Sequence, residues 1–331
     1  MKVSIIGGGS WGATLAQSLK DNNHDVLIYD INLNYINKIN EQKHPLFDCL
    51  LASVSATNNL EEALNFSDIL VLSVPTKVMR PVLKEINKKA KSPKYFINVS
   101  KGIEPDTLKR VSEIVNEEIK TQLFKDYAVL TGPSHAEELI LRKLTLLTSA
   151  SENIEFAQFV QGLFSNDTYL RVYTSTDLIG CEVGGAVKNA IAVVSGVLEG
   201  YGLGENARAA LITRGILEIV RVVKTMGGRV ETAFGLTGIG DLIVTASSSN
   251  SRNFTAGKKI GSGENYLDVV NNSIQTVEGI RTIEAMHQLC IAKKIELPII
   301  DMAYEVIFNN LNPRMAINQL LSRDLKEESL D

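Results

Sequence analysis

Apolar and polar residues alternate along the chain in two different ways. Up to about Tyr173, short apolar runs such as Val3–Ile6 and Ile69–Leu72 are separated by stretches with helical periodicity. Short apolar runs are typical of buried strands, and strands that alternate with helices predict a parallel sheet with helices on both faces. Beyond Tyr173 the strand-like runs disappear, and helical periodicity continues until near Arg323. We therefore expect an α/β domain with a doubly wound parallel sheet over residues 1–176 and an all-α domain over residues 177–331.

The apolar runs give approximate bounds for the expected elements. Strands are expected at 3–6, 26–29, 69–73, 95–99 and 128–131, and two later strands at 145–148 and 168–172 should extend or edge the sheet. A helix should lie between these last two strands at 154–163. In the C-terminal half, helices are expected at 177–200, 206–226, 278–293 and 298–309.

A glycine-rich segment directly follows the first expected strand. Gly7-Gly8-Gly9-Ser10-Trp11-Gly12 has the spacing G-x-G-x-x-G and leads into an Ala/Leu-rich helix. In this setting Gly7 permits a tight turn, Gly9 lets the backbone approach a pyrophosphate, and Gly12 lets helix and strand pack closely. The helix N-terminus adds N–H groups that attract phosphate. A tight turn without a ligand is the weaker alternative, and we predict a Rossmann-type dinucleotide site.

Asp30 ends the second expected strand at the distance where such folds carry an acidic residue for the adenosine ribose. A carboxylate at this position would repel the 2′-phosphate of NADP. The alternative is that Asp30 only caps the turn that follows. The spacing favours the ribose role and therefore NAD(H).

Two further strand-end loops contain polar groups. Ser100-Lys101-Gly102 follows one strand, and Gly132-Pro133-Ser134-His135-Ala136 follows the next. Ligands of doubly wound sheets bind beyond the carboxyl ends of the strands, so both loops are site candidates. Position alone does not separate a ligand-binding Lys101 from a solvated surface lysine. For His135, which has no second catalytic group beside it in the sequence, we favour packing within the loop.

Lys188 lies in the middle of the apolar, small-residue segment VGGAVKNAIAV. Burial of a lysine favours its neutral amine, which suits it to donate or accept a proton. The usual alternative is that the side chain extends to a solvated edge of the helix. That alternative is favoured by this segment alone and loses ground once the other motifs are considered.

The C-terminal half contains three further polar motifs. Asp241 lies among glycines and apolar residues in GIGDL, and Ser251-Arg252-Asn253 follows ten residues later. An arginine beside two small hydrogen-bonding side chains suits an anion, although a polar exposed loop would look the same. Glu278 could be a simple charge at a helix N-terminus.

Composition narrows the class of protein. The 331 residues have a formal net charge of −4, which gives no basic footprint for nucleic acid. The three cysteines are widely spaced, which indicates reduced thiols in a cytoplasmic protein, and the four histidines have no metal-ligand spacing. The N-terminal segment lacks the basic and apolar pattern of a signal peptide, and no uninterrupted apolar run approaches the ~20 residues that span a bilayer, so we expect neither a signal peptide nor a membrane span.

The motifs together resemble the soluble, bacterial type of NAD(P)-dependent glycerol-3-phosphate dehydrogenase. The resemblance covers nearly the whole chain. The matching stretches are GGGSWG, NVSKGIE, GPSHAEE, EVGGAVKNAIAVVSGVLEGYGLGENARAALITRG, GLTGIGDLIVTASSSNSRNF and TVEG. Several of these are long, which makes a chance match improbable.

The resemblance implies roles for individual residues. The catalytic group would comprise Lys188 as proton donor or acceptor, with Lys101 and Asp241. Cofactor contacts would come from Gly7, Gly9, Ser10, Trp11, Gly12, Asp30, Lys101, Ala136, Arg252, Thr276 and Glu278. Substrate contacts would come from Lys101, Gly132, Ser134, Lys188, Asp241, Ser251, Arg252 and Asn253. No metal is implied. Thr276 departs from the apolar residue often found there.

The implied reaction is reversible reduction of dihydroxyacetone phosphate to sn-glycerol 3-phosphate, which would supply phospholipid synthesis. Relatives suited to NADPH often carry a basic residue after the second strand, whereas this chain reads Tyr29-Asp30-Ile31-Asn32. NAD(H) is therefore favoured, and NADP(H) is not excluded. The expected partner is a phosphorylated triose, with no nucleic acid and no integral membrane segment, and a homodimer is compatible with the sequence. Two alternatives stay open, a dehydrogenase of another hydroxy acid or sugar acid and a non-enzymatic dinucleotide sensor.

Overall fold

The computed structural model describes residues 1–105, 107–273, 277–325 and 327–328. The chain forms two compact units, which we call the sheet unit and the helical unit. The sheet unit comprises Met1–Ser100 and Val111–Leu178, and the helical unit comprises Lys101–Arg110 and Ile179–Asp331. The sequence led us to expect one boundary near residue 176. The structure instead groups residues 101–110 with the helical unit.

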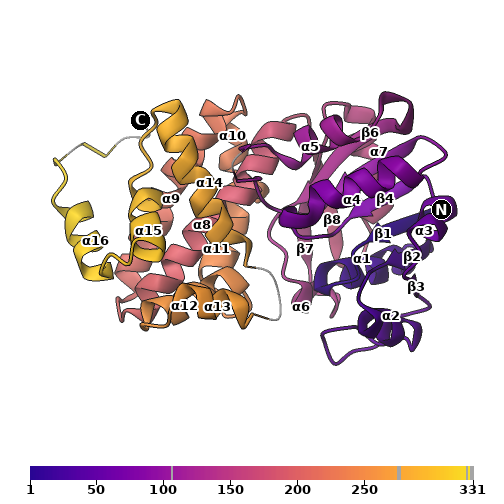
Figure 1. Cartoon of the computed structure of the whole chain (residues 1–331), viewed down its shortest axis with the longest axis horizontal. Helices are drawn as coiled ribbons and strands as arrows, with labels where there is room; N and C mark the ends of the chain where they lie inside the picture. Colours follow the sequence, from indigo (N-terminus) through magenta and orange to yellow (C-terminus); the bar gives the residue numbers. More distant parts are fainter. Residues whose placement is uncertain (106, 274–276, 326, 329–331) are drawn as a thin grey trace. The chain divides into compact units, whose positions relative to one another are not determined.

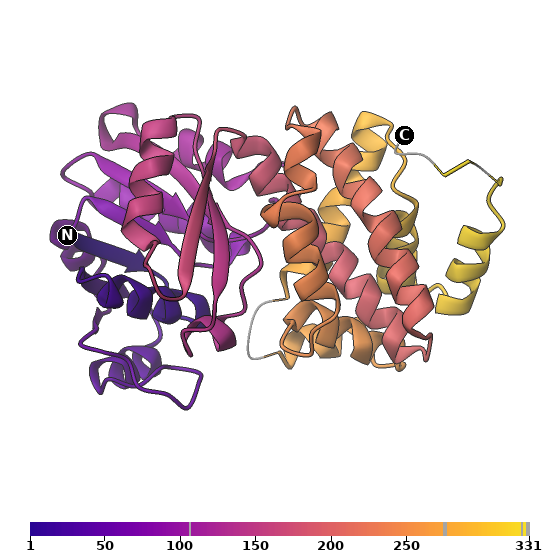
Figure 2. The same cartoon turned by 180° about the vertical axis from the view of Figure 1, so that it is seen from behind.

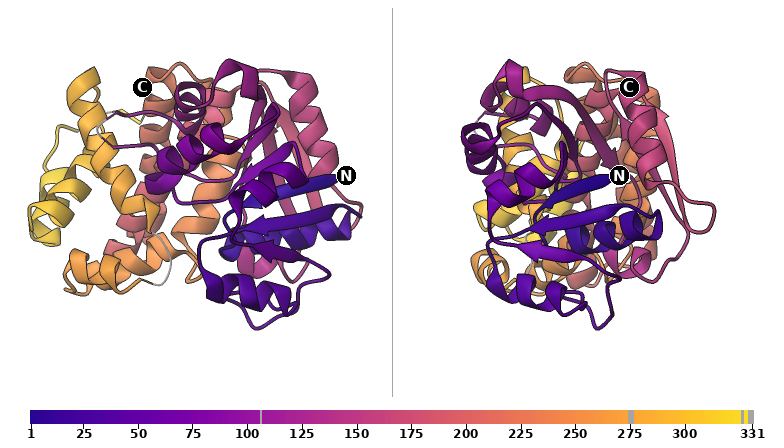
Figure 3. Two further views of the ribbon diagram at one scale, coloured as in Figure 1. Left: turned by 45° about the vertical axis from the view of Figure 1, so that its right-hand side comes forward. Right: turned by 90° about the vertical axis from the view of Figure 1, so that its right-hand side faces the viewer.

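The sheet unit contains an eight-stranded sheet in the order β3-β2-β1-β4-β5-β6-β7-β8. The strands are β1 (Lys2–Ile6), β2 (Asp25–Tyr29), β3 (Ser55–Thr57), β4 (Ile69–Leu72), β5 (Lys94–Asn98), β6 (Phe124–Thr131), β7 (Thr145–Ala150) and β8 (Leu170–Ser175). Strands β1 to β6 are parallel, and β1 and β2 pair in register from Lys2 with Asp25 to Ile6 with Tyr29 (Figure 3). The carboxyl ends of β1, β4, β5 and β6 therefore lie along one edge.

Two features of the sheet differ from the sequence prediction. The first is β3, whose three residues Ser-Ala-Thr contain no apolar run that could reveal a strand. The second is that β7 pairs with β6 in antiparallel orientation, and β8 then runs parallel to β7 (Figure 2). Between β6 and β7 the chain forms only the four-residue helix α6 (Ala136–Leu139) and not a long crossover helix. The sheet is therefore mostly parallel, as expected, and the places of β7 and β8 at its end were predicted, whereas the antiparallel orientation of β7 was not.

Helices pack on the sheet through apolar side chains that interleave with those of the strands. They are α1 (Ser10–Asp21), α2 (Leu33–Asn40), α3 (Leu60–Phe66), α4 (Thr76–Lys89), α5 (Val111–Glu118), the 3₁₀ turn η1 (Thr121–Leu123), α6 and α7 (Ile154–Phe164) (Figure 1). Central strand residues such as Ile5, Val71 and Ile97 are completely buried, as expected for a parallel sheet covered on both faces.

The helical unit has its own apolar core. Its elements are α8 (Leu178–Gly200), α9 (Glu205–Thr225), α10 (Val230–Ala233), the π-helical turn η2 (Leu236–Gly240), α11 (Asp241–Ala246), α12 (Arg252–Gly261), α13 (Tyr266–Asn271), α14 (Glu278–Lys293), α15 (Pro298–Phe308) and α16 (Pro313–Leu321) (Figure 1). The four helices expected here, α8, α9, α14 and α15, begin and end within one residue of their predicted bounds. The shorter helices between them were not predicted.

Helix α8 forms the centre of the helical unit. Among the described residues it is the one helix long and apolar enough to cross a bilayer, but 89% of its most apolar stretch is buried inside the protein. That burial is what the core helix of a globular domain shows. Glycines bring α12 very close to it, because a Cβ at Gly257 would collide with the carbonyl oxygen of Val193 and one at Gly196 with that of Phe254. This contact fixes the N-terminus of α12 relative to α8.

Candidate active site

Lys188 is buried near the middle of α8. Only 4% of the residue is exposed, and the apolar neighbours Val187 and Ile191 are completely buried. The side chain therefore does not extend to a solvated edge, which was the alternative left open by the helix sequence. A buried ammonium needs compensating hydrogen bonds or an opposite charge, because desolvation disfavours its charged form.

Two groups on α11 meet the Lys188 ammonium. Nζ donates to Asp241 Oδ1 at 2.9 Å and to Thr245 Oγ1 at 2.6 Å. The Thr245 hydroxyl in turn donates to the backbone carbonyl of Asp241 at 2.6 Å. Residues four apart lie on the same face of a helix, so α11 presents both acceptors to α8 together.

The position of α11 depends on the turn that precedes it. The chain passes through the π-helical turn η2 before Asp241, and a Cβ at Gly238 would collide with the backbone of Ala233. A Cβ at Gly184 on α8 would lie 3.3 Å from the Thr237 carbonyl oxygen, which is closer than an ordinary van der Waals contact. Gly238 thus permits the tight turn before Asp241, and Gly184 permits the close approach of this turn to α8.

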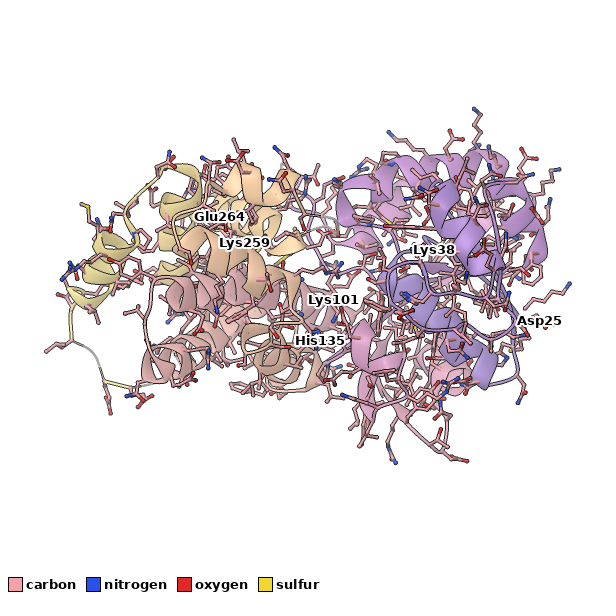
Figure 4. The ribbon with its side chains drawn as sticks, turned by 90° about the horizontal axis from the view of Figure 1, so that it is seen from below. Asp25, Lys38, Lys101, His135, Lys259 and Glu264 are labelled. Atoms are coloured by element: carbon pink, nitrogen blue, oxygen red, sulfur yellow. The ribbon has the colours of Figure 1, made fainter. Side chains whose placement is uncertain are left out.

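Lys101 reaches the other oxygen of the same carboxylate. Its Nζ lies 2.5 Å from Asp241 Oδ2, and its side chain is 18% exposed (labelled in Figure 4). Lys101 is therefore not a solvated surface lysine. One carboxylate, itself 1% exposed, bridges two ammonium groups, that of Lys188 with a 5% exposed side chain and that of Lys101 with an 18% exposed side chain.

These neighbours set the protonation of the centre. Burial lowers the pKa of Lys188 to about 7, against the attraction of Asp241 and together with the repulsion of Lys101. Burial would raise the pKa of Asp241, but the two ammonium groups outweigh it and hold that pKa below its usual value. A lysine that titrates near neutrality beside a fixed carboxylate is suited to donate and accept a proton.

The segment Ser251-Arg252-Asn253 forms the start of α12. Ser251 caps the helix by accepting a hydrogen bond from the Phe254 N–H at 3.2 Å. Asn253 is buried and donates to Asn189 Oδ1 at 2.9 Å, and it accepts from the Gly279 N–H at 2.9 Å. Arg252 is exposed at the first turn. The segment is thus not the exposed polar loop that its composition allowed. It forms the start of a helix, and Asn253 hydrogen-bonds this start to α8 and α14.

Glu278 and Thr276 complete the predicted positions of the helical unit. Glu278 is the first residue of α14, where its charge favours the helix N-terminus, as the simpler interpretation of this residue requires. Thr276 lies outside the described residues.

In the sheet unit, the glycine loop has the backbone geometry that a pyrophosphate site requires. Gly7 has φ +111°, and a Cβ there would lie against the backbone of Ser73. A Cβ at Gly12 would collide with the Gly7 carbonyl oxygen, whereas one at Gly9 would meet nothing within 4 Å. Gly9 is the N-cap of α1 and supplies no side-chain hydrogen bond to it. The backbone is thus tightly packed against the protein at Gly7 and Gly12, whereas Gly9 has free space beside it. This space allows the pyrophosphate of a dinucleotide to approach the backbone.

Ser10 and Trp11, two further predicted cofactor contacts, are the first residues of α1. Ser10 is buried, and Trp11 packs partly against the core of the sheet unit.

Asp30 lies at the end of β2 beside this loop. Its Oδ2 accepts from the Gly8 N–H at 2.6 Å, and its Oδ1 accepts from the Asn32 N–H at 2.8 Å. The second bond is the turn cap that we considered as the alternative role. The first bond ties the carboxylate to the glycine loop, which is the place a ribose-binding carboxylate would occupy.

The loop after β6 lies at the same sheet edge as the glycine loop. Gly132 has φ +140°, and Ser134 Oγ donates to the Gly132 carbonyl at 3.0 Å. Ala136 begins α6, for which His135 is the N-cap residue without a side-chain capping bond. The structure therefore brings Gly132, Ser134 and Ala136 to the edge where the sequence predicted ligand contacts.

Sequence reasoning missed two polar residues of this centre. Thr245 is recognisable only afterwards, by its four-residue spacing from Asp241 on a helix that was not predicted. Asn189 follows Lys188 directly, and its side-chain oxygen accepts the hydrogen bond from Asn253. Among the described residues no cluster of three or more His, Cys, Asp or Glu could hold a metal ion.

Comparison with known proteins identifies the family. The family model for the N-terminus of NAD-dependent glycerol-3-phosphate dehydrogenase matches residues 2–157, and that for its C-terminus matches residues 177–318. A glycerol-3-phosphate dehydrogenase (NAD(P)+) of Acholeplasma laidlawii is 64% identical over 328 residues, covering 99% of each chain. A relative of the same name from Bacillus thuringiensis is 46% identical, covering 99% of this chain and 97% of its own.

Solved structures agree with this result. The crystal structure of glycerol-3-phosphate dehydrogenase from Coxiella burnetii matches with a TM-score of 0.90 and 29% identity, over 97% of this chain and 99% of that one. The Plasmodium falciparum enzyme shares the fold, with a TM-score of 0.86 at 20% identity, over 99% and 97% of the two chains. This chain belongs to the NAD-dependent glycerol-3-phosphate dehydrogenase family.

Proposed function

We propose that Lys188 is the proton donor with which this chain reduces dihydroxyacetone phosphate to sn-glycerol 3-phosphate, the reaction of its family. The observation that carries the assignment is the buried Lys188–Asp241–Thr245 group, with Lys101 on the second carboxylate oxygen. When bound, the nicotinamide cofactor supplies the hydride that reduces the carbonyl carbon. The chain's own residues must then stabilise and protonate the carbonyl oxygen.

The hydrogen bonds of Lys188 suit it to that task. An ammonium has three N–H groups, and Asp241 and Thr245 accept two of them. The described residues provide no acceptor for the third. We assign this third N–H to the carbonyl oxygen of the substrate, to which it donates a hydrogen bond and then the proton.

Lys101 and Asp241 have supporting roles in this proposal. Lys101 adds positive potential where negative charge develops on the substrate oxygen. Asp241 holds both ammonium groups in place, and its charge keeps a useful fraction of Lys188 protonated near neutral pH. With a pKa of about 7, Lys188 can act as acid in reduction and as base in the reverse oxidation.

The substrate phosphate is assigned to the start of α12. Arg252 provides an exposed guanidinium there, and the N-terminal turn of the helix adds favourable backbone dipoles. Because Ser251 and Asn253 already have protein partners, we assign them mainly to holding this turn in shape. Gly132 and Ser134 remain predicted substrate contacts, and Ser10, Trp11, Ala136, Thr276 and Glu278 remain predicted cofactor contacts.

Replacement of Lys188 tests the proton-donor role. We expect Lys188→Ala to lower kcat for dihydroxyacetone phosphate reduction by roughly 10²-fold or more, the range of general acid catalysis, with little change in NADH affinity. The measurement is NADH absorbance under saturating substrates, with NADH affinity from fluorescence titration. Lys224→Ala, an exposed lysine on α9, is the matched control and should behave as wild type. Near-normal turnover of the Lys188 variant would remove this residue from the mechanism.

The same assay separates the two alternative functions. A dinucleotide sensor would bind NADH without oxidising it when dihydroxyacetone phosphate is added. A dehydrogenase of another hydroxy acid would oxidise NADH with an unphosphorylated keto acid and not with the triose phosphate.

We also propose a preference for NAD(H) over NADP(H). The argument is that the Asp30 carboxylate lies beside the glycine loop and would repel a 2′-phosphate. We expect kcat/KM for NADH to exceed that for NADPH by about tenfold or more, since a repulsive charge contact of 1.4 kcal/mol is a factor of ten. Asp30→Ala should narrow this ratio, chiefly by improving NADPH. A wild-type preference for NADPH would overturn this proposal and leave the Lys188 assignment unaffected.

The cellular role follows from the reaction in this proposal. The product would supply phospholipid synthesis in the cytoplasm, which is consistent with the three free cysteines. A homodimer is compatible with the proposal, and sedimentation of the purified chain would establish its oligomeric state.

A further inference from the structure

Residues 101–110, which carry Lys101, pack as part of the helical unit. Ile103 is 2% exposed within the core of that unit, and Leu108 packs against the same core. The segment doubles back on itself, because Ile103 and Arg110 form an antiparallel bridge and the Glu104 N–H donates to the Lys109 carbonyl at 2.9 Å. Its two ends, with Lys101 at one and Arg110 at the other, are therefore joined.

A buried ion pair connects this segment to α8. Arg110 Nη1 lies 2.9 Å from Glu182 Oε2, and the side chains are 12% and 4% exposed. Glu182 precedes Lys188 by six residues on the same helix, which corresponds to a rise of about 9 Å. The helix that carries the proposed proton donor thus also carries the attachment point of the segment that carries Lys101.

The energetics of such a pair argue for a positional role. Removing two charges from water costs about as much as their attraction returns, so a buried pair is weak evidence for stability. It does specify one arrangement, because a shift of the segment would separate Arg110 from Glu182. The antiparallel bridge transmits that arrangement from Arg110 to Ile103, two residues from Lys101.

We propose that Arg110 and Glu182 are positioning residues that hold Lys101 against Asp241. The inference rests on the proposed role of Lys101 in the reaction. The pair acts through Lys101 and is not assigned contact with substrate or cofactor. Its loss would let Lys101 move away from Asp241 without removing any reacting group.

Displacement of Lys101 has a signature beyond loss of stability. The Lys101 ammonium lowers the pKa of Lys188 by repulsion, so its departure lets that pKa rise. The falling limb of the pH profile for reduction should then move to higher pH. A pair that only stabilised the fold would leave this profile in place.

The experiment compares four forms of the full chain: wild type, Lys101→Ala, the double variant Arg110→Met with Glu182→Gln, and the combination of all three changes. The double variant removes both charges of this ion pair together. We expect Lys101→Ala and the double variant each to lower kcat/KM for dihydroxyacetone phosphate by about tenfold, the scale of one charge-assisted contact. In both variants the falling limb of the pH profile for reduction should move to higher pH. In the combined variant the second loss should be less than about threefold, because the pair acts only through Lys101.

Matched controls separate position from folding. Arg323→Ala removes an exposed ion pair with Glu296 in the same unit and should leave both readouts unchanged. Arg110→Lys keeps a charge for Glu182 and should recover most of the lost kcat/KM. If the double variant does not fold, the single variants Arg110→Lys and Glu182→Gln replace it. The variant with the larger loss of kcat/KM should then also show the larger shift of the pH profile.

The outcomes distinguish this inference from the function on which it rests. Wild-type kinetics of Lys101→Ala would remove Lys101 from the proposed mechanism. An impaired Lys101→Ala beside an unimpaired double variant, or losses that multiply in the combined variant, would overturn the positioning role alone.

Discussion

The glycine loop of the sheet unit and the lysine–carboxylate centre of the helical unit are built in opposite ways. The loop consists of six consecutive residues, and its shape follows from where a Cβ cannot be placed, as at Gly7 and Gly12. The centre joins residues that are far apart in sequence. Asp241 is 53 residues from Lys188 and 140 residues from Lys101, and it is hydrogen-bonded to both. Backbone geometry makes the first, whereas side-chain charge in a buried setting makes the second.

This difference predicts how each region should fail when it is changed. A site made from backbone N–H groups is sensitive to volume added at its glycines. A site made from buried charges is sensitive to loss of one charge, even when shape is kept.

The largest effect is expected from a change of charge at constant shape in the helical unit. Asp241→Asn removes the attraction that raises the pKa of Lys188, so this pKa should fall below 7 and the ammonium should be scarce at pH 7.5. We expect kcat for reduction at pH 7.5 to fall by about 10²-fold, and partly to recover at lower pH. The exposed Asp268→Asn on α13 is the control. A pH profile unchanged by Asp241→Asn would contradict this account.

The same argument predicts the direction in which the wild-type rates of reduction and oxidation change with pH. Reduction needs protonated Lys188 and should fall as pH rises through about 7, whereas oxidation needs the neutral amine and should rise.

A change of volume in the sheet unit should have the next largest effect. Gly12→Ala places a Cβ against the Gly7 carbonyl oxygen, so it should weaken NADH binding by about tenfold or more and also lower thermal stability by roughly 1–3 kcal/mol. Gly9→Ala meets no protein atom and should weaken NADH binding with little change in stability. Calorimetry and fluorescence titration of the two variants measure both quantities. Equal losses of stability in the two would show that the loop is not shaped as described.

The smallest effect on activity is expected at a buried carboxyl that takes no part in either site. Burial raises the pKa of Glu218 on α9 to about 8, although its oxygens accept from the Ile299 and Ile300 N–H groups at the start of α15. A folded-state pKa above the unfolded value of 4.5 gives stability that is complete below about 4.5 and is lost as pH rises towards 8. Glu218→Gln should abolish that part of the pH dependence, on the order of 1 kcal/mol per pH unit.

Urea unfolding between pH 5 and 8 measures this slope, with the exposed Glu231→Gln as control. The glutamine side chain of Glu218→Gln changes the hydrogen bonds at the start of α15 at every pH, so the absolute stability of this variant differs from that of wild type. The comparison therefore uses the slope of stability against pH. An identical slope in wild type and Glu218→Gln would show that Glu218 does not titrate in this range.

What the sequence determined by itself was local. The strand–glycine–helix order over residues 2–21 and the four long helices of the C-terminal half, among them the apolar α8, follow from periodicity and backbone sterics, which act between near neighbours. Family resemblance then supplied the reaction and the residue types. The short strand β3 and the antiparallel orientation of β7 were not predicted, because the local sequence carries no signal for either.

Only the tertiary structure decided which charges meet. The helix sequence alone favoured a solvated Lys188, and position alone did not choose between a bound and a free Lys101. Packing of α11 against α8, through glycines that allow close approach, buries Asp241 between the two lysines. Attachment of residues 101–110 to the helical unit is likewise invisible in the sequence, where Arg110 and Glu182 are 72 residues apart. Electrostatic energy depends on distance in space and on burial, and neither quantity is written in the local order of residues.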